Sequence, residues 1–214
     1  MNGENISITT IKIGLLGDSS VGKTAICNSF LNMEFNDDML STIGLEKLET
    51  KYKLHDGNTI KLILWDTAGQ ERFRSIALKS IKAVQGIVIV FDLTNKKSFE
   101  NINLWLEIIK ENFQNPCLVL FGNKADIEKE KWVITSEEAK KFANSKKLLY
   151  YETSAKTKQG IDEGFSYIAN ETYKKVKEKK GGNINIEEPP IKEKSGCFGK
   201  KKSKKSGNKK KQKK

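Results

Sequence analysis

Eight residues near the start of the chain have the spacing of a loop that holds phosphate. Residues 17–24, GDSSVGKT, match the pattern G-x-x-x-x-G-K-[ST] through Gly17, Gly22, Lys23 and Thr24. In such a loop consecutive backbone N–H groups surround a β-phosphate, and the helix that follows adds partial positive charge. Lys23 would place its charge between the β- and γ-phosphates, and the Thr24 hydroxyl suits Mg²⁺, which prefers oxygen donors. The alternative is a glycine-rich turn with an exposed lysine, which a preceding strand and a following helix disfavour.

The elements that position this loop are predicted from the period of the apolar residues. Short apolar runs rich in β-branched residues indicate strands, and apolar residues three and four apart indicate one face of a helix. The expected strands are residues 9–17, 48–54, 59–66, 86–93, 117–123 and 148–155. The expected helices are residues 24–32, 98–113, 135–143 and a last one that carries Ile161, Phe165, Ile168, Thr172 and Val176. Trp105 belongs to the apolar stripe of the second helix, so we expect it in the core.

Strands that alternate with helices predict an α/β fold with a mostly parallel, doubly wound sheet. Asp56-Gly57 favours a tight hairpin turn between the second and third strands. In such sheets ligands bind beyond the carboxyl ends of the strands. Polar stretches follow four of the expected strands, at residues 17–24, 66–73, 123–126 and 153–157. We therefore expect four loops to form one binding site.

Five short motifs occur in order along the chain: GDSSVGKT, STIG, WDTAGQERF, NKAD and TSAK. With these motifs the sequence resembles the small GTPases, and in particular the Rab family of the Ras superfamily, over about residues 8–178. The resemblance implies a P-loop NTPase small G domain, α/β, with a mostly parallel six-stranded sheet flanked by about five helices. We place this domain at residues 1–180 and expect residues 181–214 to be a flexible linker and a disordered polybasic tail.

The resemblance also implies which residues contact a guanine nucleotide. They are Gly17, Ser19, Ser20, Val21, Gly22, Lys23, Thr24, Ala25, Phe35, Thr42, Asp66, Gly69, Asn123, Lys124, Asp126, Ser154, Ala155 and Lys156. Thr24, Thr42 and, through a water, Asp66 are the implied Mg²⁺ ligands. Asp126 offers two carboxylate oxygens to the N1–H and N2–H₂ groups of guanine, a donor pair that adenine lacks. Sites of this kind can discriminate by about 10⁴–10⁵.

The other base contacts follow from the same resemblance. Asn123 is expected to contact the base and to hold the loops together, and the Lys124 stem to lie over one face of guanine. Phe35 corresponds to a residue that packs edgewise against the base, and the Ala155 N–H suits guanine O6.

The resemblance further implies that the site senses a γ-phosphate. In the family, the hydroxyl at Thr42 reaches Mg²⁺ only with a γ-phosphate bound, and Gly69 offers that phosphate a backbone N–H. Without it, residues 34–46 and 67–80 are expected to lose these anchors. Gln70 is placed to orient the attacking water. The sequence shows no arginine that would act in cis, so intrinsic turnover should be on the order of 10⁻⁴ s⁻¹.

We therefore expect a small monomeric GTPase that hydrolyses GTP to GDP and phosphate with Mg²⁺ and regulates vesicle and membrane traffic. Its implied partners are a GTPase-activating protein, an exchange factor and effectors. One alternative is a GTP-binding interaction module with negligible hydrolysis, targeted by its basic tail. Another is a P-loop enzyme that uses ATP, which the NKAD motif opposes.

Two departures from the Rab pattern concern partners. Of three surface aromatics that Rab proteins commonly present to effectors, only Trp65 remains, and Lys47 and Ser80 stand at the other two positions. A more polar contact surface is the consequence. Cys197 lies 17 residues from the end, so no C-a-a-X box is formed and prenylation is not expected.

The tail accounts for most of the chain's net positive charge. The formal net charge is +12, and residues 198–214 contain ten lysines and no acid, which leaves +2 for the rest. Lysines near an anionic membrane are worth about 1 kcal/mol each. An acyl chain on Cys197 would supply the second signal that stable anchoring needs. A solvated tail or a nuclear-localisation segment is the alternative, and with so few aromatics nucleic-acid binding is not expected.

Composition places the protein in a reducing compartment. The three cysteines Cys27, Cys117 and Cys197 are odd in number and far apart, which disfavours a disulfide framework or a zinc cluster. The first ten residues lack the pattern of a signal peptide, and the apolar run at 86–91 is too short to span a bilayer. We expect a cytoplasmic protein, peripheral on the cytosolic face of endomembranes or the plasma membrane.

Overall fold

The computed structural model describes residues 8–34, 45–67, 81 and 83–181. The chain divides into two units, residues 1–183 and 184–214, and all described residues belong to the first. The strands among the described residues are β1 (Thr10–Leu16), β2 (Leu45–Lys53), β3 (Thr59–Thr67), β4 (Gly86–Asp92), β5 (Cys117–Asn123) and β6 (Leu149–Glu152). The helices among them are α1 (Lys23–Phe30), α3 (Lys96–Glu100), α4 (Ile102–Asn112), a 3₁₀ turn at Lys129–Lys131, α5 (Ser136–Ser145) and α6 (Ile161–Gly181).

The strands form one six-stranded sheet in the order β2-β3-β1-β4-β5-β6. Only β2 runs antiparallel to its neighbour β3, and every other pair is parallel. The register places Ile13 of β1 between Leu64 of β3 and Gly86 of β4. The carboxyl ends of β1, β3, β4, β5 and β6 therefore lie along one edge of the sheet. This confirms the predicted α/β class.

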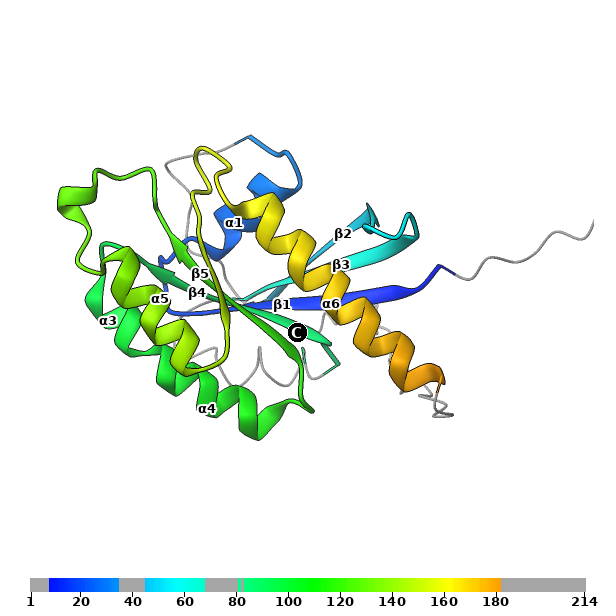
Figure 1. Cartoon of the computed structure of the whole chain (residues 1–214). Helices are drawn as coiled ribbons and strands as arrows, with labels where there is room; N and C mark the ends of the chain where they lie inside the picture. Colours follow the sequence, from blue (N-terminus) through cyan, green and yellow to red (C-terminus); the bar gives the residue numbers. More distant parts are fainter. Residues whose placement is uncertain (1–7, 35–44, 68–80, 82, 182–214) are drawn as a thin grey trace, which may run out of the picture. The chain divides into compact units, whose positions relative to one another are not determined.

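Alternate residues of the central strands pack into two separate cores. Ile11, Ile13 and Leu15 of β1 face the core that contains α1 and α6, where the rings of Phe30 and Phe165 stack at 4.2 Å. The other core lies between the sheet and α3, α4 and α5. Figure 1 shows these two groups of helices on opposite faces of the sheet. Because both faces are covered, the central strands consist almost entirely of apolar residues.

The hairpin between β2 and β3 forms as the sequence predicts. The Leu54 N–H donates to the Asn58 carbonyl at 2.8 Å, and Gly57 has a φ of 84°, which favours glycine. The Asp56 carboxylate accepts from the Asn58 N–H at 3.0 Å and fixes the turn.

One predicted helix differs. In place of a single helix over 98–113, the chain ends α3 at Glu100 and begins α4 at Ile102, with Asn101 between them. The apolar stripe is nevertheless buried, and Trp105 is 3% exposed. β6 is also shorter than predicted. No helix in the described ranges combines the length and apolar character that a bilayer span requires.

Candidate functional site

The phosphate loop follows a backbone path that only glycine permits at two positions. Gly17 has a φ of 151°, and a Cβ there would lie 2.2 Å from the Val90 carbonyl oxygen. Gly22 has a φ of 94°, and a Cβ there would lie 2.3 Å from the Asn123 side-chain nitrogen. The glycines of the motif are therefore needed for packing against β4 and β5 as well as for conformation.

Lys23 lies under the loop with its ammonium held by backbone oxygens. It is 5% exposed, and its Nζ donates to the carbonyls of Gly17 at 3.0 Å and Asp18 at 2.7 Å. Burial lowers the pKa of Lys23 to about 8, against the opposing effect of the carboxylates of Asp66 and Asp18. The N-terminus of α1 lies beside it, and its N-cap residue Gly22 offers no side-chain cap. The backbone N–H groups and the ammonium together favour an anion.

Two side-chain oxygens meet next to Lys23 and the N-terminus of α1. The Thr24 hydroxyl donates to Asp66 Oδ2 at 2.5 Å, and Asp66 is fully buried at the end of β3. The next residue, Thr67, donates to the Leu15 carbonyl at 2.7 Å and fixes the end of β3 against β1. A hydroxyl and a carboxylate are a donor set that suits Mg²⁺. Within the described ranges no three His, Cys, Asp or Glu side chains are grouped to hold a metal.

Asn123 joins three of the loops. Its side chain is 2% exposed, and its Nδ2 donates to the Val21 carbonyl in the phosphate loop at 2.9 Å. Its Oδ1 accepts from the Thr153 hydroxyl at 3.4 Å. Thr153 also accepts from the Ala125 N–H at 3.0 Å through its carbonyl. These contacts bring together the loops after β1, β5 and β6, as the sequence predicts.

The candidate base-recognition residues are held by their own neighbours. The Ser154 hydroxyl donates to Asp126 Oδ1 at 2.6 Å and accepts from the Thr157 N–H at 3.1 Å. Asp126 itself is exposed. The Lys124 ammonium pairs with Asp92 at 2.6 Å, which fixes the stem of Lys124 at the rim. Asp92, at the end of β4, was not among the predicted site residues.

The other predicted residues divide into two groups. In the described structure Ser19, Ser20 and Lys156 are exposed, Val21 and Ala155 are buried, and Ala25 is half-buried on α1. Outside the described residues lie Phe35, Thr42, Gly69, Gln70 and Cys197. Their roles stay predictions.

Sequence reasoning missed a connection between the phosphate loop and α4. Asp18 accepts from Asn101 Nδ2 at 2.6 Å and from Trp105 Nε1 at 2.9 Å. A signal was present, because a buried tryptophan N–H usually needs an acceptor. The helical period of the apolar stripe did not indicate which residue accepts the hydrogen bond from Trp105.

The exposed side of β2 and β3 carries paired charges. Lys47 pairs with Glu49, and Lys61 on β3 pairs with the same carboxylate at 2.7 Å. Trp65 is half-buried, and Ser80 lies outside the described residues.

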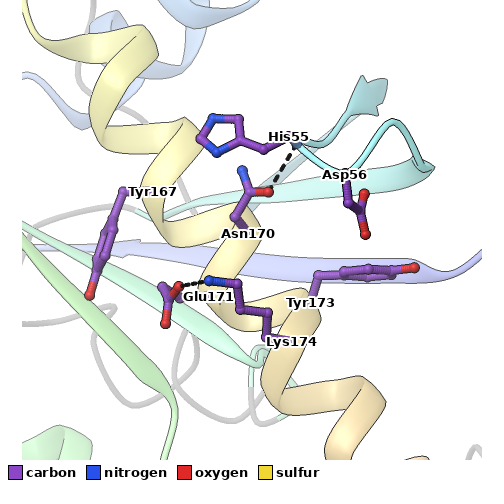
Figure 2. Close-up of a pocket in the computed structure, with 7 residues that line it drawn as sticks. All are labelled: His55, Asp56, Tyr167, Asn170, Glu171, Tyr173 and Lys174. Carbon is purple, nitrogen blue, oxygen red and sulfur yellow. Dashed lines mark hydrogen bonds and ion pairs between the residues drawn. The ribbon is translucent and has the colours of Figure 1, made fainter.

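A separate pocket of about 190 Å³ lies between the β2–β3 turn and α6 (Figure 2). The His55 N–H donates to Asn170 Oδ1 at 3.1 Å, and His55 Nε2 lies 2.7 Å from the Ser166 hydroxyl. The pocket lies at the amino end of β3, opposite the edge where the loops meet. These contacts attach the hairpin to α6.

Comparison with known proteins points to one family. The Ras family model matches residues 12–174, a range that includes the phosphate loop and the loops after β3, β5 and β6. The Ras-related protein Rab-13 of Rattus norvegicus is 40% identical over 173 residues, which cover 80% of this chain and 84% of that protein. The Ras-related protein Rab-10 of Diplobatis ommata is 40% identical over 178 residues, or 82% and 88%. The Ras-related protein Rab-1D of Dictyostelium discoideum is 38% identical over 199 residues, or 92% and 93%.

Proposed function

The chain belongs to the Rab proteins of the Ras family of small GTPases, and on this premise we propose that it is a GTP–GDP switch in membrane traffic. Members of the family hydrolyse GTP to GDP. The proposal for this chain is supported above all by the Asn123–Val21 hydrogen bond, which joins the candidate base loop to the phosphate loop.

Most of the residues that we propose to contact the nucleotide lie in the described ranges. Lys23 and the N–H groups at the start of α1 bind the phosphates. Asp126, oriented by Ser154, accepts from the two guanine donors. Thr24 and Asp66 would hold Mg²⁺. When bound, this ion neutralises part of the negative charge of the phosphates. The Thr24 hydroxyl donates its proton to Asp66 and keeps lone pairs for the metal, and Asp66 would hold a water bound to the ion.

The catalytic and sensing steps rest on residues outside the described ranges. We propose that Gln70 orients the attacking water and that Thr42 and Gly69 detect the γ-phosphate. The slow intrinsic reaction then requires a GTPase-activating protein, and slow product release requires an exchange factor. Release of phosphate from bound GTP should be stimulated by an activator and abolished by Gln70→Leu. If the unmodified protein with an activator released phosphate no faster than Gln70→Leu, a GTP-binding interaction module with negligible hydrolysis would be favoured instead.

We propose that a monomer reaches membranes through its tail. The lysines of 198–214 would attract an anionic leaflet, and Cys197 would carry an acyl chain. In cells Cys197→Ser should move the protein from the membrane to the soluble fraction. An unchanged membrane-bound fraction in Cys197→Ser would refute the role of Cys197. Membrane binding that persists after deletion of residues 198–214 would refute the role of the lysines.

A further inference from the structure

Asp18 connects the phosphate loop to α4 in a way that nothing in the proposed chemistry requires. Its backbone carbonyl accepts from Lys23 Nζ at 2.7 Å, while its side chain turns toward the helix. There Oδ2 accepts from Asn101 Nδ2 at 2.6 Å and Oδ1 accepts from Trp105 Nε1 at 2.9 Å. Both carboxylate oxygens are thus engaged by side chains of the α3–α4 region.

A carboxylate in a phosphate loop opposes the function of the loop. It repels the phosphates of a nucleotide, and it attracts the ammonium of Lys23, on which phosphate binding depends. Asp18 is only half-buried, so its side chain has room to turn. If the Asp18 carboxylate were not held in place, it would compete with the nucleotide phosphates for the Lys23 ammonium.

The structure prevents this with two donors that have little freedom. Trp105 is 3% exposed and packed in the core between the sheet and α4. Asn101 occupies the junction where α3 ends and α4 begins, the interruption that the apolar stripe did not predict. Both hydrogen bonds direct the Asp18 carboxylate toward α4.

We propose that Asn101 and Trp105 are positioning residues that hold the Asp18 carboxylate away from Lys23 and the nucleotide phosphates, and thereby set nucleotide affinity. The inference rests on the proposed guanine-nucleotide function. Its consequence is electrostatic: when the carboxylate is released, phosphate binding weakens, and removal of its charge restores the binding.

Paired variants separate this effect from a purely structural one. Asn101→Ala removes one donor, and Trp105→Phe removes the other while a ring stays in the core. Asp18→Asn removes the charge, and its amide oxygen still accepts from Trp105. In the single Asp18→Asn variant the Asn101 amide can rotate to present its oxygen. Asn112→Ala is the matched control, because Asn112 donates to the Ile108 carbonyl at 2.9 Å on the same helix.

The measurement is the dissociation rate of fluorescent GDP and of a fluorescent non-hydrolysable GTP analogue from the full-length protein. We expect Asn101→Ala to accelerate release by about tenfold, more for the triphosphate, because one additional like charge faces the phosphates. Combination with Asp18→Asn should restore the rate to within about twofold, and about 0.5 M salt should reduce the difference by screening. Asn112→Ala should release nucleotide like the unmodified protein.

Two results would overturn the inference. One is an unchanged release rate in both Asn101→Ala and Trp105→Phe. The other is acceleration that persists in full when Asp18→Asn is added, which would show that the contacts only stabilise α4. If the unmodified protein binds no guanine nucleotide at all, the proposed function fails instead. Thermal unfolding of each variant identifies loss of fold, and Asn101→Ala keeps the test decisive if Trp105→Phe does not fold.

Discussion

The side-chain amide of Asn123 donates to the backbone carbonyl of Val21 at 2.9 Å, across 102 residues of sequence. This contact holds the loop after β5 against the phosphate loop after β1. Because Asn123 also accepts from Thr153, one buried side chain fixes the loops after β1, β5 and β6 relative to one another.

Asn123→Ala should therefore weaken nucleotide binding without a change in any group that touches phosphate. In this variant the Val21 carbonyl and the Thr153 hydroxyl lose their buried partner. Each loss lowers the free energy of unfolding by about 1–3 kcal/mol. We expect release of fluorescent GDP to be accelerated by roughly 10–100-fold. A release rate within twofold of the unmodified protein would show that the loops are positioned by other contacts.

Asp126→Asn should change the base that is preferred. An amide offers one acceptor and one donor, which no longer matches the two donors of guanine but matches xanthine, whose C2 carries an oxygen. Affinity for GDP should fall roughly 10²–10⁴-fold while affinity for xanthosine diphosphate rises. Calorimetric titration with both nucleotides measures this. Glu128→Gln removes an exposed acid in the same loop and should leave both affinities unchanged.

The charge cluster on β2 and β3 gives a dependence on pH. Hydrogen bonds from Lys47 and then Lys61 lower the pKa of Glu49 from 4.5 to about 2. A carboxyl with a lowered pKa in the folded state stabilises the protein above pH 4.5 and loses this effect as the pH falls toward 2. The stability difference between the unmodified protein and Glu49→Gln should be small, because the pair is exposed, and should shrink over that range and in 1 M salt. NMR titration measures the pKa of the Glu49 carboxyl directly, and a value at or above 4.5 would contradict this prediction.

Two buried threonines should respond in opposite ways to the same substitution. Thr172 is fully buried on α6, and its hydroxyl lacks a hydrogen-bond partner among the described residues. Thr172→Val should raise the free energy of unfolding by roughly 1 kcal/mol, because an unsatisfied polar group is removed. Thr67→Val should lower it by about 1–3 kcal/mol, because the Leu15 carbonyl loses its donor. Urea unfolding at a fixed GDP concentration compares the stability of the two variants. A lower free energy of unfolding in both would refute the claim that the Thr172 hydroxyl is unsatisfied.

The sequence indicated most of the fold because its strands and helices have clear periods. Apolar runs such as residues 86–91 identify strands buried on both faces, and their alternation with helices fixes the edge where the loops meet. The break at Asn101 was hidden because the apolar stripe continues through it with the helical period unchanged. The Trp105–Asp18 and Lys124–Asp92 contacts were hidden because each pairs residues from different loops or helices, and only the folded chain brings them together.

The central claim is that this edge of the sheet binds guanine nucleotides, and competition binding tests it most directly. The protein is loaded with fluorescent GDP in Mg²⁺, and the bound probe is displaced with unlabelled GTP, GDP or ATP. We predict that GTP and GDP displace it at similar concentrations and that ATP requires about 10⁴-fold more, because adenine cannot donate to both oxygens of Asp126. Displacement by ATP at the same concentration as GTP would contradict the account.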